Sequence, residues 1–307
     1  MPWILLLIAI VCLYGVTGIL ITNQAIGNHP QWRTLQSRPS EYGLMAETVA
    51  FPSLDGIQLT AWWLPGNALP PGGSQATIIL AHGRDSNRAG MLSRAAFLVR
   101  QGYNVLNIDL RNHGESQGHY ITPGYREAFD IQGGVAYLRQ HGQTAPIIAF
   151  GHSYGAVAAL HAAAQCAEIV AVIADSAFTS PQDLLKQMAH HSEFSIGTRL
   201  GVQLARLPFF EWSFNLSFFL RTGVRLKFHQ SDALQAVKQI GNRPILFIAG
   251  EQDWLAPPEN AHLLCEAAAD PNTRLLIVPE AGHSTTYSTA LEHYEAEVLT
   301  FLQRTLS

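Results

Sequence analysis

Short apolar runs and longer amphipathic stretches alternate along most of this chain. Between residues 76 and 175, continuous apolar segments of strand length are each followed by a segment of helical character. Strands that are apolar on both faces are typical of a parallel sheet with helices packed on both sides. The expected strands are 47–51, 57–64, 76–81, 104–110, 147–150, 169–175, 244–250 and 274–278. The expected helices are 88–101, 126–141, 154–168, 258–269 and a last one from about 289 to the C-terminus.

The first two strands differ from the rest because they are joined by a tight turn. The turn is Ser53-Leu54-Asp55-Gly56, which is too short for a crossover and pairs the two strands in antiparallel fashion. The sequence therefore predicts an α/β fold with a mostly parallel, eight-stranded sheet.

The alternation stops at Ser180 and the sheet resumes at Pro244. The intervening segment, about 181–243, has helical character and is rich in aromatic residues, so it is expected to form a helical cap insertion. Two roles are open for these rings: they line an apolar pocket, or they pack the cap onto the sheet. The aromatic residues are Phe194, Phe209, Phe210, Trp212, Phe214, Phe218 and Phe219.

Residues 2–22 form an uncharged apolar run that is long enough to span a bilayer as a helix. The run lacks the basic start and short apolar core of a cleavable signal peptide. A buried core helix is the alternative, but a surface that is apolar all round favours lipid. We therefore expect a single-pass membrane anchor at 1–23, a polar linker at 24–44 and a folded domain at 45–307. Arg33 and Arg38 follow the run and favour a cytoplasmic location for the folded domain.

Composition and charge exclude several other classes of protein. The chain has 307 residues, of which 48% are hydrophobic and 14% charged, and its net charge is -4. This length suits one large α/β domain, and the absence of a basic patch in the sequence argues against nucleic-acid binding. Cys12, Cys166 and Cys265 are too far apart to indicate a disulfide framework or a zinc site.

The segment Gly151-His152-Ser153-Tyr154-Gly155 lies between an expected strand and an expected helix. This is the G-x-S-x-G nucleophile elbow in its strand–turn–helix setting, in which a sharp turn lifts the serine hydroxyl above the sheet edge. Glycine is needed at both ends because a side chain there would collide with the neighbouring strand or helix. Ser153 is the expected nucleophile, and an ordinary βα turn is the alternative.

A serine hydroxyl needs a base to remove its proton. In this architecture the partners follow in the order serine, acid, histidine, each on a loop at the carboxyl end of a strand. His283 directly follows an expected strand, whereas His262 and His293 lie within expected helices. His283 is therefore the expected general base.

The acid that orients the histidine is expected at another strand end. Asp253 follows the strand 244–250 and fits this position. Glu251 is a neighbouring candidate that suits a solvated loop position better, and Asp175 is an alternative because it also ends a strand.

Two backbone N–H groups are expected to stabilise a tetrahedral oxyanion. One is that of Tyr154, directly after the nucleophile and at the positive end of the following helix. The other comes from the loop after the strand 76–81, where Gly83 permits a tight turn and Arg84 supplies the N–H.

Taken together, these segments resemble the α/β-hydrolase family, in the serine-hydrolase branch of bacterial membrane-anchored esterases and serine aminopeptidase-like lipases. The resemblance spans about 45–305, and its segments are 82–83, 109–116, 151–155, 250–253 and 281–283. The second segment departs from the family's D-x-R-G-x-G-x-S pattern at Asn112 and His113. It shapes a loop beside the pocket in that family, so its residues are not expected to be catalytic. The resemblance implies an α/β-hydrolase fold in which the insertion covers the serine as a lid.

The expected reaction is hydrolysis of a carboxylic ester through an acyl-enzyme on Ser153, with no metal or organic cofactor. The expected partners are a small ester with an apolar acyl or alcohol group and, through residues 2–22, a lipid bilayer. A serine peptidase and a thioesterase are alternatives because they use the same triad. A non-catalytic membrane-attached scaffold fits less well, since all three triad residues are present in order.

Overall fold

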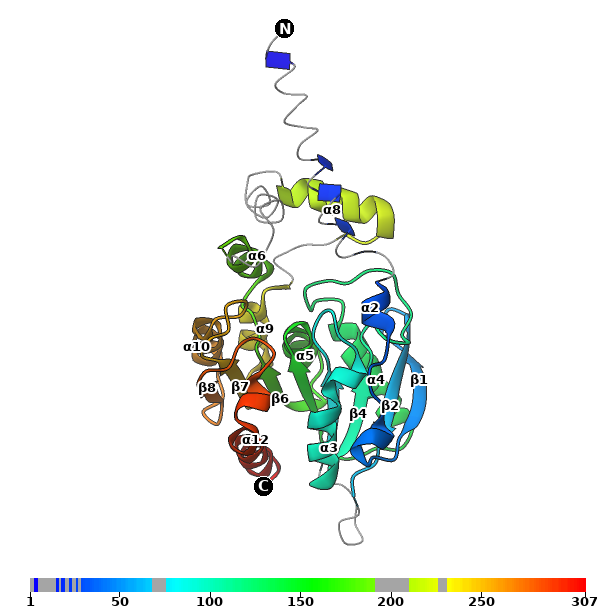
Figure 1. Ribbon diagram of the computed structural model, residues 1–307, viewed down its shortest axis with the longest axis vertical. Coiled ribbons are helices and arrows are strands. Elements are labelled where there is room, and N and C mark those ends of the chain that lie inside the picture. Colours follow the sequence, from blue (N-terminus) through cyan, green and yellow to red (C-terminus); the bar gives the residue numbers. More distant parts are fainter. Residues whose placement is uncertain are drawn as a thin grey trace.

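One mixed sheet organises the molecule (Figure 1). The computed structural model describes residues 29–67, 76–190, 210–225 and 231–307, together with residues 3, 4, 15, 16, 18, 19, 22, 23 and 26. Within these residues the sheet has eight strands in the order β1-β2-β4-β3-β5-β6-β7-β8. β1 and β2 pair in antiparallel fashion, as do β2 and β4, and every other pairing is parallel. The expectation of an eight-stranded, mostly parallel sheet is therefore confirmed.

The elements follow the alternation of the sequence closely. The strands are β1 Glu47–Pro52, β2 Gln58–Leu64, β3 Thr77–Ala81, β4 Asn104–Ile108, β5 Ile147–His152, β6 Ile169–Asp175, β7 Ile245–Gly250 and β8 Arg274–Val278. The helices of the body are α3 Leu92–Arg100, α4 Ala128–Gln140, α5 Tyr154–Gln165, α9 Ala233–Ile240, α10 Pro258–Ala267, α11 Thr286–Thr289 and α12 Leu291–Leu306. α6 Pro181–His190 and α8 Phe210–Thr222 lie in the insertion, and α2 Pro30–Arg33 precedes the sheet. Two short 3₁₀ helices, η1 Pro39–Tyr42 and η2 Arg88–Met91, complete the described elements.

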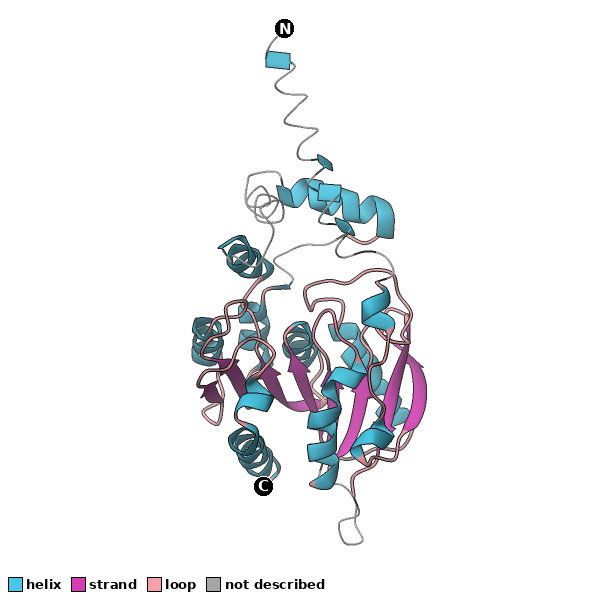
Figure 2. Ribbon diagram, viewed as in Figure 1, coloured by secondary structure: helices cyan, strands magenta, loops and turns pink. Residues whose placement is uncertain are grey.

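Helices cover both faces of the sheet, which explains why its parallel strands are apolar throughout (Figure 2). All five side chains of β3 are buried; Ile79 and Ala81 face one core, whereas Ile78 and Leu80 face the other. α4, α5, α9 and α10 contribute to the first core, and α3 and α12 contribute to the second. This arrangement places the carboxyl ends of the parallel strands at one edge, where loops can gather functional side chains.

The insertion is smaller than the sequence pattern suggests. α9 was expected within the cap, but Ala233, Ala236, Val237 and Ile240 are buried in the core that also contains α5. The helix therefore belongs to the body, because its apolar stripe packs against α5 and α10. Residues 191–209 and 226–230 of the insertion, with the expected cap residues Phe194 and Phe209, lie outside the described residues.

The expected anchor at 2–22 lies mostly outside the described residues. Within the part of the chain that the structure describes, no helix combines the length and apolar character needed to cross a bilayer. The segment 24–44, expected as an irregular tether, instead contains α2 and η1 over its described part. The side chain of Trp32 in α2 is 1% exposed, so this segment packs firmly onto the body.

Candidate active site

Ser153 alone makes the turn between β5 and α5. Its φ of 53° and ψ of -116° lie in a region that residues with a side chain rarely adopt. The backbone N–H of Ser153 donates to the carbonyl oxygen of Asp175 at 2.8 Å, which fixes the turn against the neighbouring strand β6.

The glycines on either side of Ser153 are required by close backbone contacts. A Cβ at Gly151 would lie 2.0 Å from the carbonyl oxygen of Gly155. A Cβ at Gly155 would lie 2.3 Å from the carbonyl oxygen of Ala81 in β3. Both distances are far below van der Waals contact, so the G-x-S-x-G spacing reflects the packing of helix on strand.

The structure brings Ser153, His283 and Asp253 together from three different loops. Oγ of Ser153 lies 2.9 Å from Nε2 of His283. Nδ1 of the same ring lies 2.8 Å from Oδ2 of Asp253 and 3.0 Å from its Oδ1. The N–H groups of Leu255 and Ala256 donate to Oδ1 of Asp253 at 3.0 and 2.8 Å, and they orient the carboxylate. This continuous hydroxyl–imidazole–carboxylate arrangement is one in which a base can accept a serine proton.

Glu251, the alternative acid of the Asp253 loop, has a different contact. Its carboxylate accepts a hydrogen bond at 3.1 Å from the backbone N–H of Glu280, in the loop that leads to His283. Glu251 thus braces one loop against the other, and the carboxylate that contacts the imidazole belongs to Asp253.

His82 shapes the loop that follows β3. Its Nε2 accepts a hydrogen bond from the N–H of Leu110 at 3.1 Å, so its Nδ1 carries the proton and donates to the carbonyl oxygen of Gly83 at 2.7 Å. Burial lowers the pKa of His82 to about 4, so the ring is neutral near pH 7. These two bonds hold the backbone of Gly83 next to Ser153, where a Cβ on the glycine would be 3.2 Å from that of the serine.

Arg84 and Tyr154, the expected oxyanion donors, both lie near Ser153. Tyr154 is the first residue of α5, where the N–H groups of a helix have no partner within the helix and its dipole favours negative charge. Arg84 follows Gly83 and lines the same cavity as Ser153.

A cavity of about 160 Å³ opens beside Ser153. Its lining is mostly polar and consists of Gly83, Arg84, Ser86, Gly90, Met91, Arg94, His152, Ser153, His283 and Ser284. No aromatic residue from the described part of the insertion lines it. Phe218 instead packs edge-on against Tyr120 at 5.5 Å between ring centroids, which fits the packing role left open for these rings. Among the described residues, no group of three or more His, Cys, Asp and Glu side chains is placed to hold a metal ion.

Asp175, the other alternative acid, is fully buried beneath the site. Its carboxylate accepts hydrogen bonds from Arg94 at 2.7 Å, Tyr294 at 2.9 Å and Thr286 at 3.0 Å. Although burial favours the neutral acid, the Arg94 guanidinium and the other donors hold the pKa of Asp175 well below its usual range. Because Thr286 lies three residues after His283, Asp175 ties the histidine loop to the strand beneath Ser153.

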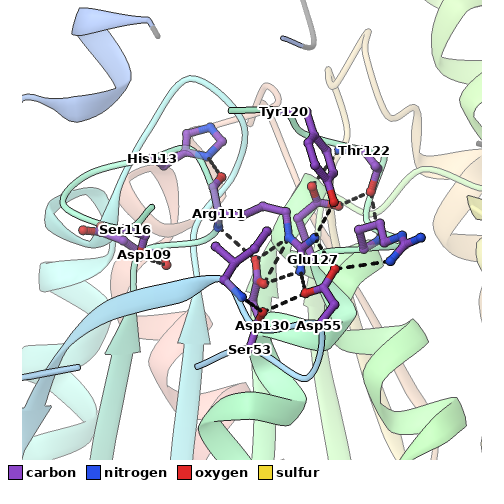
Figure 3. A network of polar contacts seen from close by, with 12 residues as sticks. Ser53, Asp55, Asp109, Arg111, His113, Ser116, Tyr120, Thr122, Glu127 and Asp130 are labelled. Carbon is purple, nitrogen blue, oxygen red and sulfur yellow. Dashed lines mark hydrogen bonds and ion pairs between the residues drawn. The ribbon is translucent and has the colours of Figure 1, made fainter. Parts of the chain in front are cut away.

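The segment 109–116 forms a buried polar network beside the site (Figure 3). Arg111 is fully buried and pairs with Asp130 at 2.7 Å and with Asp55 at 2.8 Å. Burial lowers the pKa of Arg111, but the two carboxylates outweigh this effect and raise the pKa above its usual value. Asp109 pairs with Arg88, and both side chains are likewise buried. The network fixes the loop shape and does not contact Ser153, in agreement with a structural role for this motif.

Trp32 is a residue near the site that sequence analysis missed. Its indole stacks on His113 at 4.8 Å between ring centroids, and the guanidinium of Arg84 lies 5.7 Å from its centroid. His113 in turn meets His82 edge-on at 4.9 Å. The segment before the sheet therefore supports the loop that carries Arg84.

Hydrogen bonds fasten the same segment to two loops. Arg33 donates to the carbonyl oxygen of Ser116 at 2.7 Å and to the side chain of Asn112 at 3.0 Å. Asn87, which follows the Arg84 loop, donates to the carbonyl oxygen of Trp32 at 3.2 Å. The one available signal in the sequence was a lone tryptophan in an otherwise polar stretch.

Comparison with known proteins agrees with the fold. A family model described as "Alpha/beta hydrolase family" matches residues 78–299, more than half of the chain. The protein YfhR of Escherichia coli (strain K12) is 26% identical over 247 residues, which cover 79% of this chain and 75% of that protein. The alpha/beta hydrolase domain-containing protein WAV2 of Arabidopsis thaliana is 27% identical over 272 residues, covering 87% of this chain and 81% of that one.

A similar solved structure is that of the Pyrococcus furiosus esterase Pf2001. It superposes with a TM-score of 0.71 at 26% identity, covering 92% of this chain and 99% of that one. The expected α/β-hydrolase family is therefore confirmed by both sequence and structure.

Trp32→Ala should lower both the unfolding free energy and kcat. Removal of a buried indole costs about 3–5 kcal/mol of unfolding free energy, and the Arg84 loop loses its support. Trp32→Phe, which keeps an aromatic stack, should recover most of the turnover number. Urea unfolding and kcat measured with a small ester provide the readouts, and Trp212→Ala at a 65% exposed position is the matched control. An alanine variant with unchanged stability and kcat would contradict this role for Trp32.

The unfolding free energy should fall as the pH drops from about 6.5 towards 4. His82 is buried with a pKa of about 4, whereas the unfolded chain protonates its histidines near pH 6.5. In that window the unfolded state binds a proton that the native state excludes, which removes about 3 kcal/mol at this one site. Urea unfolding at pH 7 and pH 4.5 measures the change. His82→Gln should reduce the pH dependence, whereas His262→Gln on an exposed surface of α10 should leave it as it is.

Proposed function

We propose that this chain, which belongs to the alpha/beta hydrolase family, is a serine hydrolase that cleaves carboxylic esters through an acyl-enzyme. The observation that carries the proposal is the unbroken contact from Oγ of Ser153 through His283 to Asp253. The likeness to a protein named as an esterase supports the same reaction class.

In the proposed reaction, Oγ of Ser153 attacks the ester carbonyl carbon while Nε2 of His283 accepts the hydroxyl proton. The tetrahedral intermediate collapses, the imidazolium gives its proton to the departing alcohol, and the acyl group stays on Ser153. Water then attacks the acyl-enzyme with His283 again as base, releasing the carboxylic acid and restoring the serine. Asp253 holds the imidazole tautomer, and the N–H groups of Arg84 and Tyr154 stabilise the oxyanion.

The cavity beside Ser153 bears on the size of the substrate. At about 160 Å³ and with mostly polar walls, it suits a compact group on one side of the ester. We propose that the apolar remainder of the substrate extends towards the insertion. If the reaction is ester hydrolysis, small p-nitrophenyl esters should be better substrates than aminoacyl anilides or thioesters, and a reversed order would favour the peptidase or thioesterase alternative.

Residues 2–22 are proposed as a single-pass membrane anchor, with the hydrolase domain on the cytoplasmic side. The uncharged apolar run supports the anchor, and Arg33 and Arg38 after it support the orientation. Full-length protein that resists extraction from membranes by carbonate would support this assignment.

Ser153→Ala should abolish labelling by a fluorophosphonate probe and lower kcat by about 10⁴- to 10⁶-fold. The substitution removes one oxygen and leaves no large void, so the folded state should persist. Ser284→Ala is the matched control, because Ser284 lines the same cavity and its loss should leave labelling intact. Retention of more than a tenth of the activity in Ser153→Ala would exclude Ser153 as the nucleophile, and an unlabelled wild type would favour a non-catalytic scaffold.

Asp253→Asn should mainly impair catalysis, whereas Asp175→Asn should mainly impair stability. Asp253→Asn should lower kcat by about 10⁴-fold by favouring the wrong imidazole tautomer, with little change in stability. Asp175→Asn leaves the buried Arg94 without its carboxylate, so it should lower the unfolding free energy by about 3–5 kcal/mol while kcat of the folded protein falls far less. Glu251→Gln should retain most activity. If Asp175→Asn proved the catalytically more damaging substitution at equal folded fraction, the acid would have to be reassigned.

A further inference from the structure

Helix α8 presents large apolar side chains on two opposite faces. One face is turned to the body: Phe214 is 5% exposed, and Phe218 is fully buried against Tyr120. The opposite face is open, with Trp212 65%, Leu216 40%, Phe219 37% and Leu220 73% exposed.

These four open positions follow the spacing i, i+4, i+7 and i+8, which places them in one stripe along the helix. A helix on the surface of a soluble protein normally carries polar residues on its outer face, and one that is apolar all round is buried in protein or in lipid. The stripe is also contiguous, unlike the single exposed apolar residues found on most surfaces. The outer face of α8 therefore indicates a contact surface.

The same helix touches the end of the apolar run 2–22. A Cβ at Gly18 would lie 3.0 Å from backbone atoms of Ser213, so the run and α8 pack backbone to backbone. The side chain of Arg221, about two helical turns further along, donates a hydrogen bond to Asn23, just beyond the run.

Two described residues between the run and the sheet, Ile26 and Trp32, contact the body. Ile26 forms an antiparallel bridge with Tyr120, the residue on which Phe218 packs, and Trp32 is buried a few residues later. Figure 1 shows α8 across one end of the molecule, with the N-terminus beyond it on the side away from the sheet. The open stripe therefore faces the side on which the apolar run leaves the body.

We infer that the outer face of α8 lies in the headgroup region of the bilayer that holds residues 2–22. This inference rests on the proposed membrane anchor. Because α8 touches the run at Gly18, within about one helical turn of its end at Thr22, an inserted run places α8 at the membrane boundary. Tryptophan and phenylalanine are favoured at that depth.

The charges at the end of α8 fit the same partner. Arg225 is exposed and its guanidinium lies 5.3 Å from the ring centroid of Phe219, so an apolar ring and a cation are paired at one place. Arg221, at the same end of the helix, is bonded to Asn23 at the end of the run. Arginine at an interface reaches lipid phosphates while its stem and the neighbouring ring stay in the apolar zone.

The depth of Trp212 tests this inference directly. Full-length protein is reconstituted into phosphatidylcholine vesicles containing some phosphatidylglycerol, with bromine atoms near the start of the acyl chains. Subtracting the emission of Trp212→Phe from that of the wild type isolates Trp212, and the expected result is loss of that emission in brominated vesicles. Trp63→Phe, in β2 of the body, is the matched control, and the emission assigned to Trp63 should not be quenched. Hydrolysis of p-nitrophenyl acetate confirms that each variant is folded.

The outcomes separate the anchor from the docking of α8. Protein that resists carbonate extraction and shows quenched Trp212 supports both. Protein that resists extraction while Trp212 stays unquenched overturns the docking and leaves the anchor in place. In that case, a dimer that Leu220→Glu converts to a monomer would show that a second copy of the chain covers the stripe. Protein that washes off the vesicles overturns the anchor, and the docking with it, without affecting the proposed ester hydrolysis.

Discussion

A positive φ at Ser153 is the constraint around which the site is built. A non-glycine residue in this conformation is disfavoured by about 1–3 kcal/mol, so the turn persists because its surroundings permit no other path. The N–H of Ser153 is bonded to β6, and Gly151 and Gly155 allow α5 to pack backbone to backbone against β5 and β3. Everything that fixes this turn also fixes Oγ at 2.9 Å from His283, so packing and chemistry depend on the same contacts.

Asp175 extends that constraint to the histidine loop. Its backbone carbonyl accepts from Ser153, and its side chain accepts from Thr286 beyond His283. The ion pair with Arg94 is buried, and such pairs contribute little net stability because desolvation offsets much of the attraction. We infer that the main role of Asp175 is to position the site, since its single buried carboxyl group sets the spacing between two loops that are remote in the sequence.

The sequence predicted the parts of the site that depend on local pattern and on strand order. Ser153 could be placed because strand, turn and helix adjoin in the chain, and Asp253 and His283 because each directly follows a parallel strand. The carboxyl ends of parallel strands meet at one edge, so strand-end residues gather without any knowledge of side-chain contacts. Asp175 also ends a strand, and its burial beneath the edge depends on Arg94 and Tyr294, which no local pattern identifies.

Other features escaped prediction because they depend on partners distant in the chain. The apolar spacing of α9 is the same whether the helix packs on a cap or on α5. The C-terminal boundary of the insertion, expected at about 243, was therefore placed too far along the chain. The packing of Trp32 depends on His113 and Arg84. These residues lie in the loops after β4 and β3, far from Trp32 in the sequence. For this reason a polar stretch with one tryptophan was interpreted as a tether, although the tryptophan packs on Arg84 and His113 beside the site.

The described residues between Gly18 and Arg33 contact both the insertion and the loops beside the site. At one end they pack on α8 of the insertion, and at the other they support the loops of Arg84 and Asn112. The intervening Ile26 is bridged to Tyr120, the residue on which Phe218 of α8 packs. If residues 2–22 lie in a bilayer, the contacts of Gly18, Ile26 and Trp32 restrict how the hydrolase domain is oriented on the membrane. The edge of the sheet that carries Ser153 would then be held in a restricted orientation relative to the lipid surface.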